Sequence, residues 1–264
     1  MMDDVTRAIV NRPAGTRLLV LSDYDGTLAE FDPDPTIPRP APRTAELLAK
    51  LATCTALSFG IVSGRRIADL RTRTQLPSRV YLAGLHGMEI EVGSRRWQHP
   101  DLDDARQYVR MLYELLDDVH ESVAGLVLED KHASVAVHVR AVAPELRVAA
   151  IERADRCAAK WLVKGKLRRL TGSYVVEYLP NIAAHKGDAT RWIIEDIEER
   201  CKQRVWTVFI GDDLTDEDAF KVIKHGIGVL VGSRDTHATH RVADTRDVEA
   251  LLEWLTSSVA PNLV

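Results

Sequence analysis

Leu18-Leu19-Val20-Leu21 runs through Ser22 into Asp23-Tyr24-Asp25-Gly26-Thr27, so two carboxylates stand where an apolar segment ends. A short apolar run of this kind is typical of a buried β-strand. Side chains of an extended segment alternate in direction, so Asp23 and Asp25 can share one side while Tyr24 points away, and Gly26 allows a sharp turn. Two interpretations are open: a nucleophilic aspartate with a partner acid, or an acidic turn that caps the following segment.

A second acidic turn favours the chemical interpretation. The run Val205-Trp206-Thr207-Val208-Phe209-Ile210 is another buried-strand candidate, and it leads into Gly211-Asp212-Asp213-Leu214-Thr215-Asp216-Glu217-Asp218. Carboxylates gathered this densely near Asp23 would raise one another's pKa or disrupt the site unless a cation balanced them. Neither turn carries Cys or His, and oxygen ligands suit Mg²⁺ better than zinc. The later acids are also typical of a helix N-terminus, and we expect both roles in this segment.

The composition argues against several classes of function. With 264 residues the chain is long enough for two modest domains. Its 35 basic and 39 acidic residues give a net charge of −4, so we expect neither a nucleic-acid nor a membrane partner. The start, Met1-Met2-Asp3-Asp4, lacks the features of a signal peptide. The three scattered cysteines fit the reduced thiols of a cytoplasmic protein. Oligomeric state leaves no mark on the sequence, and a monomer is the working expectation.

The two ends of the chain show alternating strand and helix patterns. Predicted strands lie near 18–22, 57–62, 80–83, 205–210 and 228–231, and predicted helices include 188–203, one from about 216, and 247–257. This alternation indicates an α/β fold with a parallel sheet covered on both faces. Ligands of such sheets bind beyond the carboxyl ends of the strands, which is where both acidic turns lie.

The middle of the chain has a different pattern. Two long helices are predicted over about 101–122 and 144–163, and two hairpins over 127–139 and 167–178. Hairpins indicate an antiparallel sheet with helices on one face. We therefore predict a core built from 1–87 and 183–264, interrupted by an α+β cap over 88–182.

The order of the motifs resembles that of the haloacid dehalogenase-like (HAD) phosphatases. The four motifs in question are Asp23-x-Asp25-Gly26-Thr27, Ser63, Lys186 and Gly211-Asp212-Asp213-x-x-Asp216. Other segments are similar to the trehalose-6-phosphate phosphatases of that superfamily: Val62-Ser63-Gly64-Arg65, Gly84-Leu85-His86-Gly87, Glu129-Asp130-Lys131, His138-Val139-Arg140, Glu177-x-x-Pro180 and Lys186-Gly187. The resemblance extends over about 18–255 and implies a Rossmann-like, parallel-sheet HAD core with an inserted α+β cap. Val139 stands where the family usually has Tyr.

The resemblance implies a role for each motif. Asp23 is expected to attack phosphorus and form an aspartyl-phosphate, with Asp25 as general acid and base. Ser63 and Lys186 are expected to bind the phosphoryl group. The implied Mg²⁺ ligands are Asp23, the backbone carbonyl of Asp25 and Asp212, with Asp213 and Asp216 in support. The implied substrate-binding residues are Arg65, His86 and Gly87 in the core, and Glu129, Lys131 and Glu177 in the cap.

The activity so implied is Mg²⁺-dependent hydrolysis of trehalose 6-phosphate to trehalose and phosphate, as a step of trehalose biosynthesis. Association with a trehalose-phosphate synthase is a possible further partnership. The alternatives are the same chemistry on another sugar phosphate (sucrose 6-phosphate or a mannosyl compound), a phosphomutase, or a catalytically silent partner of a synthase. The intact acids Asp23, Asp25 and Asp212, together with Lys186, argue against a silent protein.

Several of these residues also have plainer interpretations. Ser63 alone would be a helix cap and Lys186 alone a solvated side chain. Glu129 and Lys131 could form an exposed hairpin pair of little energetic value. His138 and Arg140 could line a binding site or a wetted strand. Arg66, Arg71 and Arg73 have the pattern of a solvated helix surface.

Overall fold

A computed structural model describes residues 2–32, 38–131 and 133–259, and these form two compact units. The first unit takes the described parts of 1–31, 38–97 and 184–264, and the second contains Asp32 and 98–183. The long segment 98–183 therefore interrupts the first unit, which resumes at residue 184.

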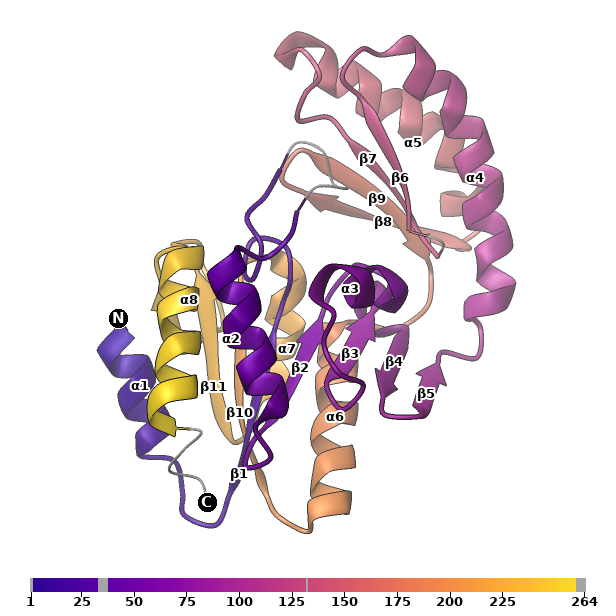
Figure 1. Ribbon diagram of the computed structural model, residues 1–264. Coiled ribbons are helices and arrows are strands. Elements are labelled where there is room, and N and C mark those ends of the chain that lie inside the picture. The colour runs from indigo at the N-terminus through magenta and orange to yellow at the C-terminus, as the bar shows by residue number, and fades with distance from the viewer. Residues whose placement is uncertain (1, 33–37, 132, 260–264) are drawn as a thin grey trace. The chain divides into compact units, whose positions relative to one another are not determined.

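The first unit is built on an eight-stranded sheet with the order β12-β11-β10-β1-β2-β3-β4-β5 (Figure 1). All neighbouring pairs from β12 to β3 are parallel, and β4 pairs antiparallel with β3. The strands are β1 Arg17–Ser22, β2 Ser58–Val62, β3 Tyr81–Gly84, β4 Glu89–Val92, β5 Arg95–Gln98, β10 Val205–Gly211, β11 Gly226–Val231 and β12 His240–Val242. The predicted α/β fold with a largely parallel sheet is confirmed.

Helices cover both faces of this sheet, which explains the uninterrupted apolar runs of its central strands. Leu18 and Val20 of β1 belong to a core shared with α1 (Met2–Val10), α2 (Pro42–Thr53), α3 (Ile67–Thr74) and α8 (Thr245–Trp254). Leu19 and Leu21 belong to a core shared with α6 (Lys186–Cys201) and α7 (Glu217–Val222). Alternate residues of one strand thus fill two cores. Short helical turns complete the unit: η1 Leu85–Gly87, η3 Leu214–Asp216 and η4 Leu255–Val259.

The second unit is an antiparallel sheet with two long helices. Its strands β6 (Val127–Asp130), β7 (Val135–His138), β9 (Val175–Pro180) and β8 (Leu167–Gly172) lie in that order. The helices are α4 (Leu102–Ser122) and α5 (Arg147–Val163), with the turn η2 (Pro144–Leu146) before α5. Val135, Val137 and Tyr178 share a core with apolar residues of both helices.

The register of this second sheet separates its apolar and polar side chains. Glu129 pairs with Ala136, which pairs with Glu177, so these three residues form one row across the sheet. His138 lies two positions beyond Ala136 and so shares its face. These side chains therefore lie on the face opposite the apolar core. Lys131 contacts Glu177 on this face, and we call Glu129, Lys131, His138 and Glu177 the polar row.

Some elements differ from the sequence prediction. Residues 88–97, expected in the cap, belong to the first unit because β4 and β5 extend its sheet. Helix α1 and strand β12 were not predicted, and both are short, with nine and three residues. Of the helices that the structure describes, none has the length and apolar character needed to cross a bilayer.

Candidate functional site

Parallel pairing brings the two acidic turns together at one edge of the large sheet. Leu21 lies beside Phe209 and Ser22 beside Ile210, so Asp23 and Asp212 follow adjacent strands. The Asp23 N–H donates to the Ile210 carbonyl at 2.8 Å. Gly26 has φ +77°, and a Cβ there would lie 2.4 Å from a carboxylate oxygen of Asp212. The motif therefore needs glycine for both its turn and the close approach of the second acid.

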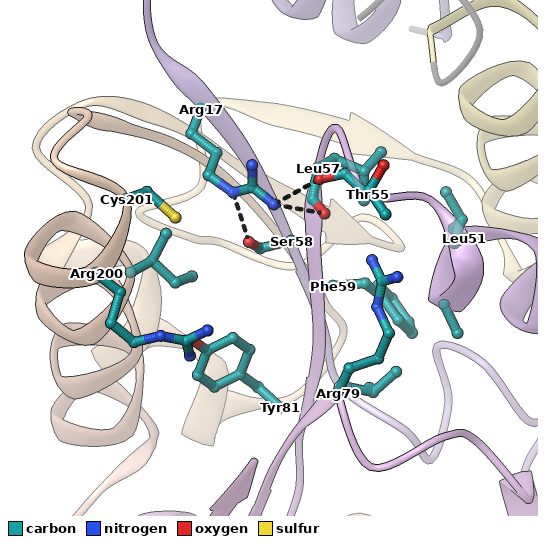
Figure 2. A pocket seen from close by; sticks show the side chains of 13 residues that line it. Arg17, Leu51, Thr55, Leu57, Ser58, Phe59, Arg79, Tyr81, Arg200 and Cys201 are labelled. Carbon is teal, nitrogen blue, oxygen red and sulfur yellow. Dashed lines mark hydrogen bonds between the residues drawn. The ribbon is translucent and has the colours of Figure 1, made fainter. Parts of the chain in front are cut away.

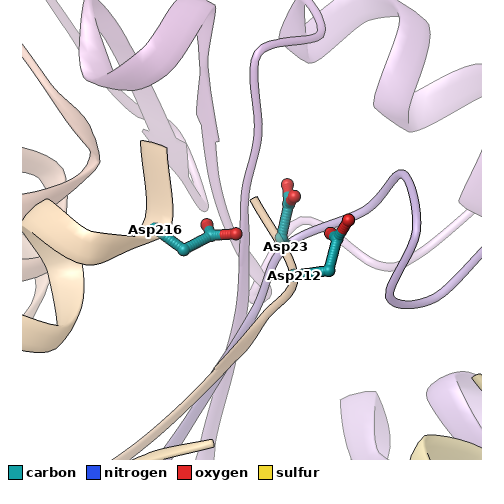
Figure 3. A group of neighbouring side chains, drawn as sticks. All are labelled: Asp23, Asp212 and Asp216. Atoms are coloured by element: carbon teal, nitrogen blue, oxygen red, sulfur yellow. The ribbon is translucent and has the colours of Figure 1, made fainter. Parts of the chain in front are cut away.

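Three carboxylates and one ammonium form the centre of the site. Oxygen atoms of Asp23, Asp212 and Asp216 lie within 4.8 Å of one another (Figure 3). Lys186 Nζ lies 2.9 Å from Asp23 Oδ1 and 2.7 Å from Asp216 Oδ1. The Lys186 side chain is only 2% exposed, so the interpretation of a solvated lysine is wrong. The four side chains come from three segments that are distant in sequence: the turn after β1, the start of α6 and the turn after β10.

Burial sets the electrostatics of this cluster. It raises the pKa of Asp23 well above its usual range, against the opposing charge of Lys186. Burial and the neighbouring Asp216 raise the pKa of Asp212 to about 7. Burial also raises the pKa of Asp216, and Lys186 again opposes the rise. Burial alone would lower the pKa of Lys186, but Asp216 and Asp23 outweigh it and raise that pKa. Lys186 thus stays cationic, and its single positive charge does not balance three carboxylates when all of them are ionised.

The donor set fits a hard divalent cation. Carboxylate oxygens are the ligands that Mg²⁺ prefers, and the unbalanced negative charge would be offset by it. Asp216 is already occupied on both oxygens, since Oδ1 accepts from Lys186 and Oδ2 accepts from the Asp213 N–H at 2.9 Å. Thr27 donates to Asp212 Oδ1 at 3.2 Å. Asp23 and Asp212 therefore have more free acceptor capacity for a metal than Asp216 does.

Asp25 is paired with an arginine from the second predicted motif. Arg65 Nε donates to Asp25 Oδ2 at 2.7 Å and Nη2 donates to Oδ1 at 2.6 Å. The Arg65 side chain is 5% exposed, against 27% for Asp25. The fully buried Ser63 accepts a hydrogen bond at its Oγ from the Arg65 N–H at 3.1 Å. The turn after β2 thus holds both Ser63 and the partner of Asp25.

His86 and Gly87 lie in the turn after β3. His86 has φ 57°, a left-handed conformation that is uncommon outside glycine. Its ring lies so close to Gly64 that a Cβ at residue 64 would come within 2.7 Å of it. A Cβ at Gly87 would lie 2.7 Å from the carbonyl oxygen of His185. These contacts join the motifs around residues 63, 86 and 186 at the same edge of the sheet.

In the second unit, each predicted substrate-binding residue has a partner within the polar row. Lys131 Nζ donates to Glu177 Oε2 at 3.0 Å, and His138 Nε2 lies 2.9 Å from Glu129 Oε2. Ser134 donates to the other oxygen of Glu177. Glu177 is buried. The interpretation of Glu129 and Lys131 as an exposed pair is wrong, because their side chains are only 17% and 15% exposed.

A second arginine supports the acidic turn and was missed in the sequence. Arg234 Nε donates to the Asp212 carbonyl at 2.9 Å, and Arg234 Nη2 donates to the Asp213 carbonyl at 2.5 Å. Its guanidinium also pairs with Glu217, which accepts from the His237 N–H at 2.7 Å. Burial would raise the pKa of Glu217, but hydrogen bonds from His237, Thr236 and Arg234 lower it to about 2. No motif surrounds Arg234, so only the fold reveals this contact.

A cavity of about 210 Å³ lies at the opposite end of the same strands (Figure 2). Its lining includes Arg17, Ser58 and Tyr81, the first residues of β1, β2 and β3. Arg17 donates to the carbonyls of Thr55 and Leu57, and Arg79 donates to those of Thr53 and Cys54. These guanidiniums bind carbonyls at and just beyond the end of α2, so the cavity is separate from the acidic cluster and has a structural explanation.

Comparison with known proteins identifies the family. The trehalose-phosphatase family model matches residues 21–249. The trehalose-phosphate phosphatase of Mycobacterium avium is 34% identical over 230 residues, which cover 84% of this chain and 56% of that protein. Trehalose-phosphate phosphatase B of Arabidopsis thaliana is 30% identical over 269 residues, covering 95% of this chain and 70% of that protein. The chain therefore spans only about half the length of its mycobacterial relative.

The fold agrees with that of a solved relative. The C-terminal domain of the Candida albicans trehalose-6-phosphate phosphatase superposes with a TM-score of 0.78 at 22% identity, covering 92% of this chain and 94% of that one. At this identity the match speaks for the fold alone, which is the HAD core with a cap. From its sequence match and its fold, this chain belongs to the trehalose-phosphatase family.

Proposed function

We propose that the protein is a Mg²⁺-dependent phosphatase that hydrolyses trehalose 6-phosphate to trehalose and phosphate. The observation that carries the proposal is the convergence of Asp23, Asp212, Asp216 and Lys186 at the carboxyl ends of paired strands. Such a site can bind a dianionic phosphoryl group beside an anionic nucleophile only when positive charge is added. The activity for which the family and its relatives are named supports the choice of sugar phosphate.

Asp23 is the proposed nucleophile. One of its oxygens would form a bond to phosphorus while the bond from phosphorus to the sugar oxygen breaks, giving an aspartyl-phosphate. Lys186, 2.9 Å from Asp23, would hold that carboxylate in place and offset charge on the phosphoryl oxygens. Ser63, on the neighbouring strand end, would donate a hydrogen bond to the phosphoryl group.

Asp25 is the proposed general acid and base. It would give its proton to the departing sugar oxygen and then take one from the water that hydrolyses the aspartyl-phosphate. Asp23, Asp212 and the Asp25 carbonyl would hold Mg²⁺, with Asp213 and Asp216 in support. The ion would supply charge neutralisation at the phosphoryl group when bound.

The polar row of the second unit is the proposed sugar-binding element. Charged side chains form directional hydrogen bonds with hydroxyl groups. Contacts within the polar row already orient these side chains: Lys131 binds Glu177, and His138 binds Glu129. Arg65, His86 and Gly87 were predicted to bind substrate from the first unit. The assignment of the first unit as catalytic and the second as specificity-determining is part of the same proposal. Association with a synthase and cytoplasmic location stay predictions.

A parallel assay tests the function. Phosphate release is measured with Mg²⁺ from trehalose 6-phosphate, sucrose 6-phosphate and glucose 6-phosphate, with Asp23→Asn as the inactive control. We expect release chiefly from trehalose 6-phosphate and none from the variant. Equal release from all three substrates would contradict the assigned specificity, and no release from any would point to the silent alternative.

A further inference from the structure

An ion-pair chain on α3 extends from Asp25 to residues that no motif includes. Arg65 Nη1 donates to Asp69 Oδ2 at 3.0 Å, and Arg73 Nε donates to the same oxygen at 2.7 Å. Asp69 and Arg73 are four residues apart on α3 and so share one face of the helix, and Arg65 lies two residues before the helix begins. The Arg73 side chain is 7% exposed. The sequence expectation of a solvated Arg73 is therefore wrong.

The chain closes into a ring of contacts around Tyr24. Arg73 Nη1 donates to the Pro38 carbonyl at 2.6 Å, and the Tyr24 hydroxyl donates to the same oxygen at 3.2 Å. The Arg65 guanidinium carbon lies 5.4 Å from the centre of the Tyr24 ring. Tyr24 is fully buried and stands between Asp23 and Asp25 in the sequence. Arg65 is thus held on three sides, by Asp69, by Tyr24 and by Asp25.

Stability alone is a poor explanation for this arrangement. The desolvation of buried charges offsets most of their mutual attraction, so such pairs add little net stability. What a bidentate pair between arginine and a carboxylate does supply is a fixed orientation of the carboxylate plane. Among the four ion-paired residues, which are Asp25, Arg65, Asp69 and Arg73, Asp25 is the one with a proposed role in proton transfer.

We infer that Asp69 and Arg73 are positioning residues that act through Arg65 to hold the Asp25 carboxylate in the orientation for proton transfer. The inference rests on the proposed function and gives Arg65 a positioning role in place of direct substrate binding. General acid catalysis matters most when the leaving group is a poor one, as a sugar alkoxide is. Proton transfer matters little for p-nitrophenyl phosphate, whose leaving group departs as a stable anion.

The test compares kcat/KM for trehalose 6-phosphate and for p-nitrophenyl phosphate, both with Mg²⁺, in the wild type, Asp69→Ala and Arg73→Met. This parameter reports the steps up to departure of the leaving group, so the later role of Asp25 as a base, which both substrates share, does not enter it. We expect the ratio of the two kcat/KM values to fall about tenfold in each variant, because small displacements of a reacting group are costly. Asp69→Asn keeps one acceptor and should recover part of the ratio. Arg71→Met is the matched control, since Arg71 also lies on α3 but pairs with Glu91, and its ratio should equal that of the wild type.

Each result bears on a different claim. Equal losses on both substrates in Asp69→Ala and Arg73→Met would indicate a merely structural role and overturn the inference alone. A wild type that hydrolyses neither substrate would overturn the proposed function and the inference with it. Thermal melting of every variant checks folding, and Asp69→Asn provides the readout if the larger deletions do not fold.

Discussion

Replacing Asp212 by its uncharged isostere should change stability in opposite directions with and without Mg²⁺. Burial raises the pKa of Asp212 from its ordinary value of 3.8 to about 7 in the metal-free protein. Keeping Asp212 ionised therefore costs the folded state about 4 kcal/mol relative to the unfolded chain. The Asp212→Asn variant keeps the shape of the side chain and removes this cost.

The direction of the pH dependence follows from proton binding. Between 3.8 and about 7 the folded protein holds a proton on Asp212 that the unfolded chain has lost, so stability falls as the pH rises through this window. Without metal, Asp212→Asn should be more stable than the wild type by about 2 kcal/mol near pH 5 and by about 4 kcal/mol near pH 8. Saturating Mg²⁺ should make the wild type more stable than Asp212→Asn near pH 8, because the Asp212 carboxylate binds the ion and the amide of the variant binds it more weakly.

Urea unfolding followed by circular dichroism, with EDTA or with Mg²⁺, measures these differences. Asp218→Asn is the matched control, because it removes the same charge from the same segment outside the acidic cluster. It should keep the stabilisation by Mg²⁺ that the wild type shows. If Asp212→Asn were less stable than the wild type near pH 8 without metal, or were stabilised by Mg²⁺ as strongly, the assigned electrostatics of the cluster would be wrong.

Three other substitutions probe the same site. Asp23→Asn should abolish phosphate release while a melting curve shows an intact fold, and residual turnover would contradict nucleophilic attack by Asp23. Lys186→Met should lower metal-free stability by about 3–5 kcal/mol in urea, because it leaves Asp23 and Asp216 without their cation; an unchanged midpoint would refute this. Glu217→Gln should cost about 3 kcal/mol at neutral pH, since the Glu217 pKa is lowered from 4.5 to about 2. That cost should disappear as the pH falls through this range, and a loss independent of pH would contradict it.

Much of the candidate site could be predicted because its chemistry is local in sequence. Asp23 and Asp212 each follow an apolar run, and strand ends of a parallel sheet lie at one edge. The residue pattern therefore predicted both the fold class and the acids that the structure brings together. The buried position of Lys186 needed the neighbouring motifs as support, since a lone lysine before a helix is usually solvated.

Other features depend on contacts that no local pattern encodes. Arg73 has the sequence context of an exposed helix residue, but its side chain is buried and donates to the carbonyl of Pro38 in the segment before α2. Arg234 contacts the backbone of the acidic turn from a segment without a motif. Strands β4 and β5 have only four residues each, and their pairing with the large sheet was not predicted from the sequence.

The central claim is that the Asp23 carboxylate becomes phosphorylated during turnover. The direct measurement is acid quenching of the enzyme with trehalose 6-phosphate and Mg²⁺, followed by borohydride reduction and peptide mass analysis. The account predicts a reduced, formerly phosphorylated side chain at Asp23 that is absent without Mg²⁺ and absent from Asp23→Asn. Rapid phosphate release with no modification at Asp23, or with modification at Asp25 instead, would contradict it.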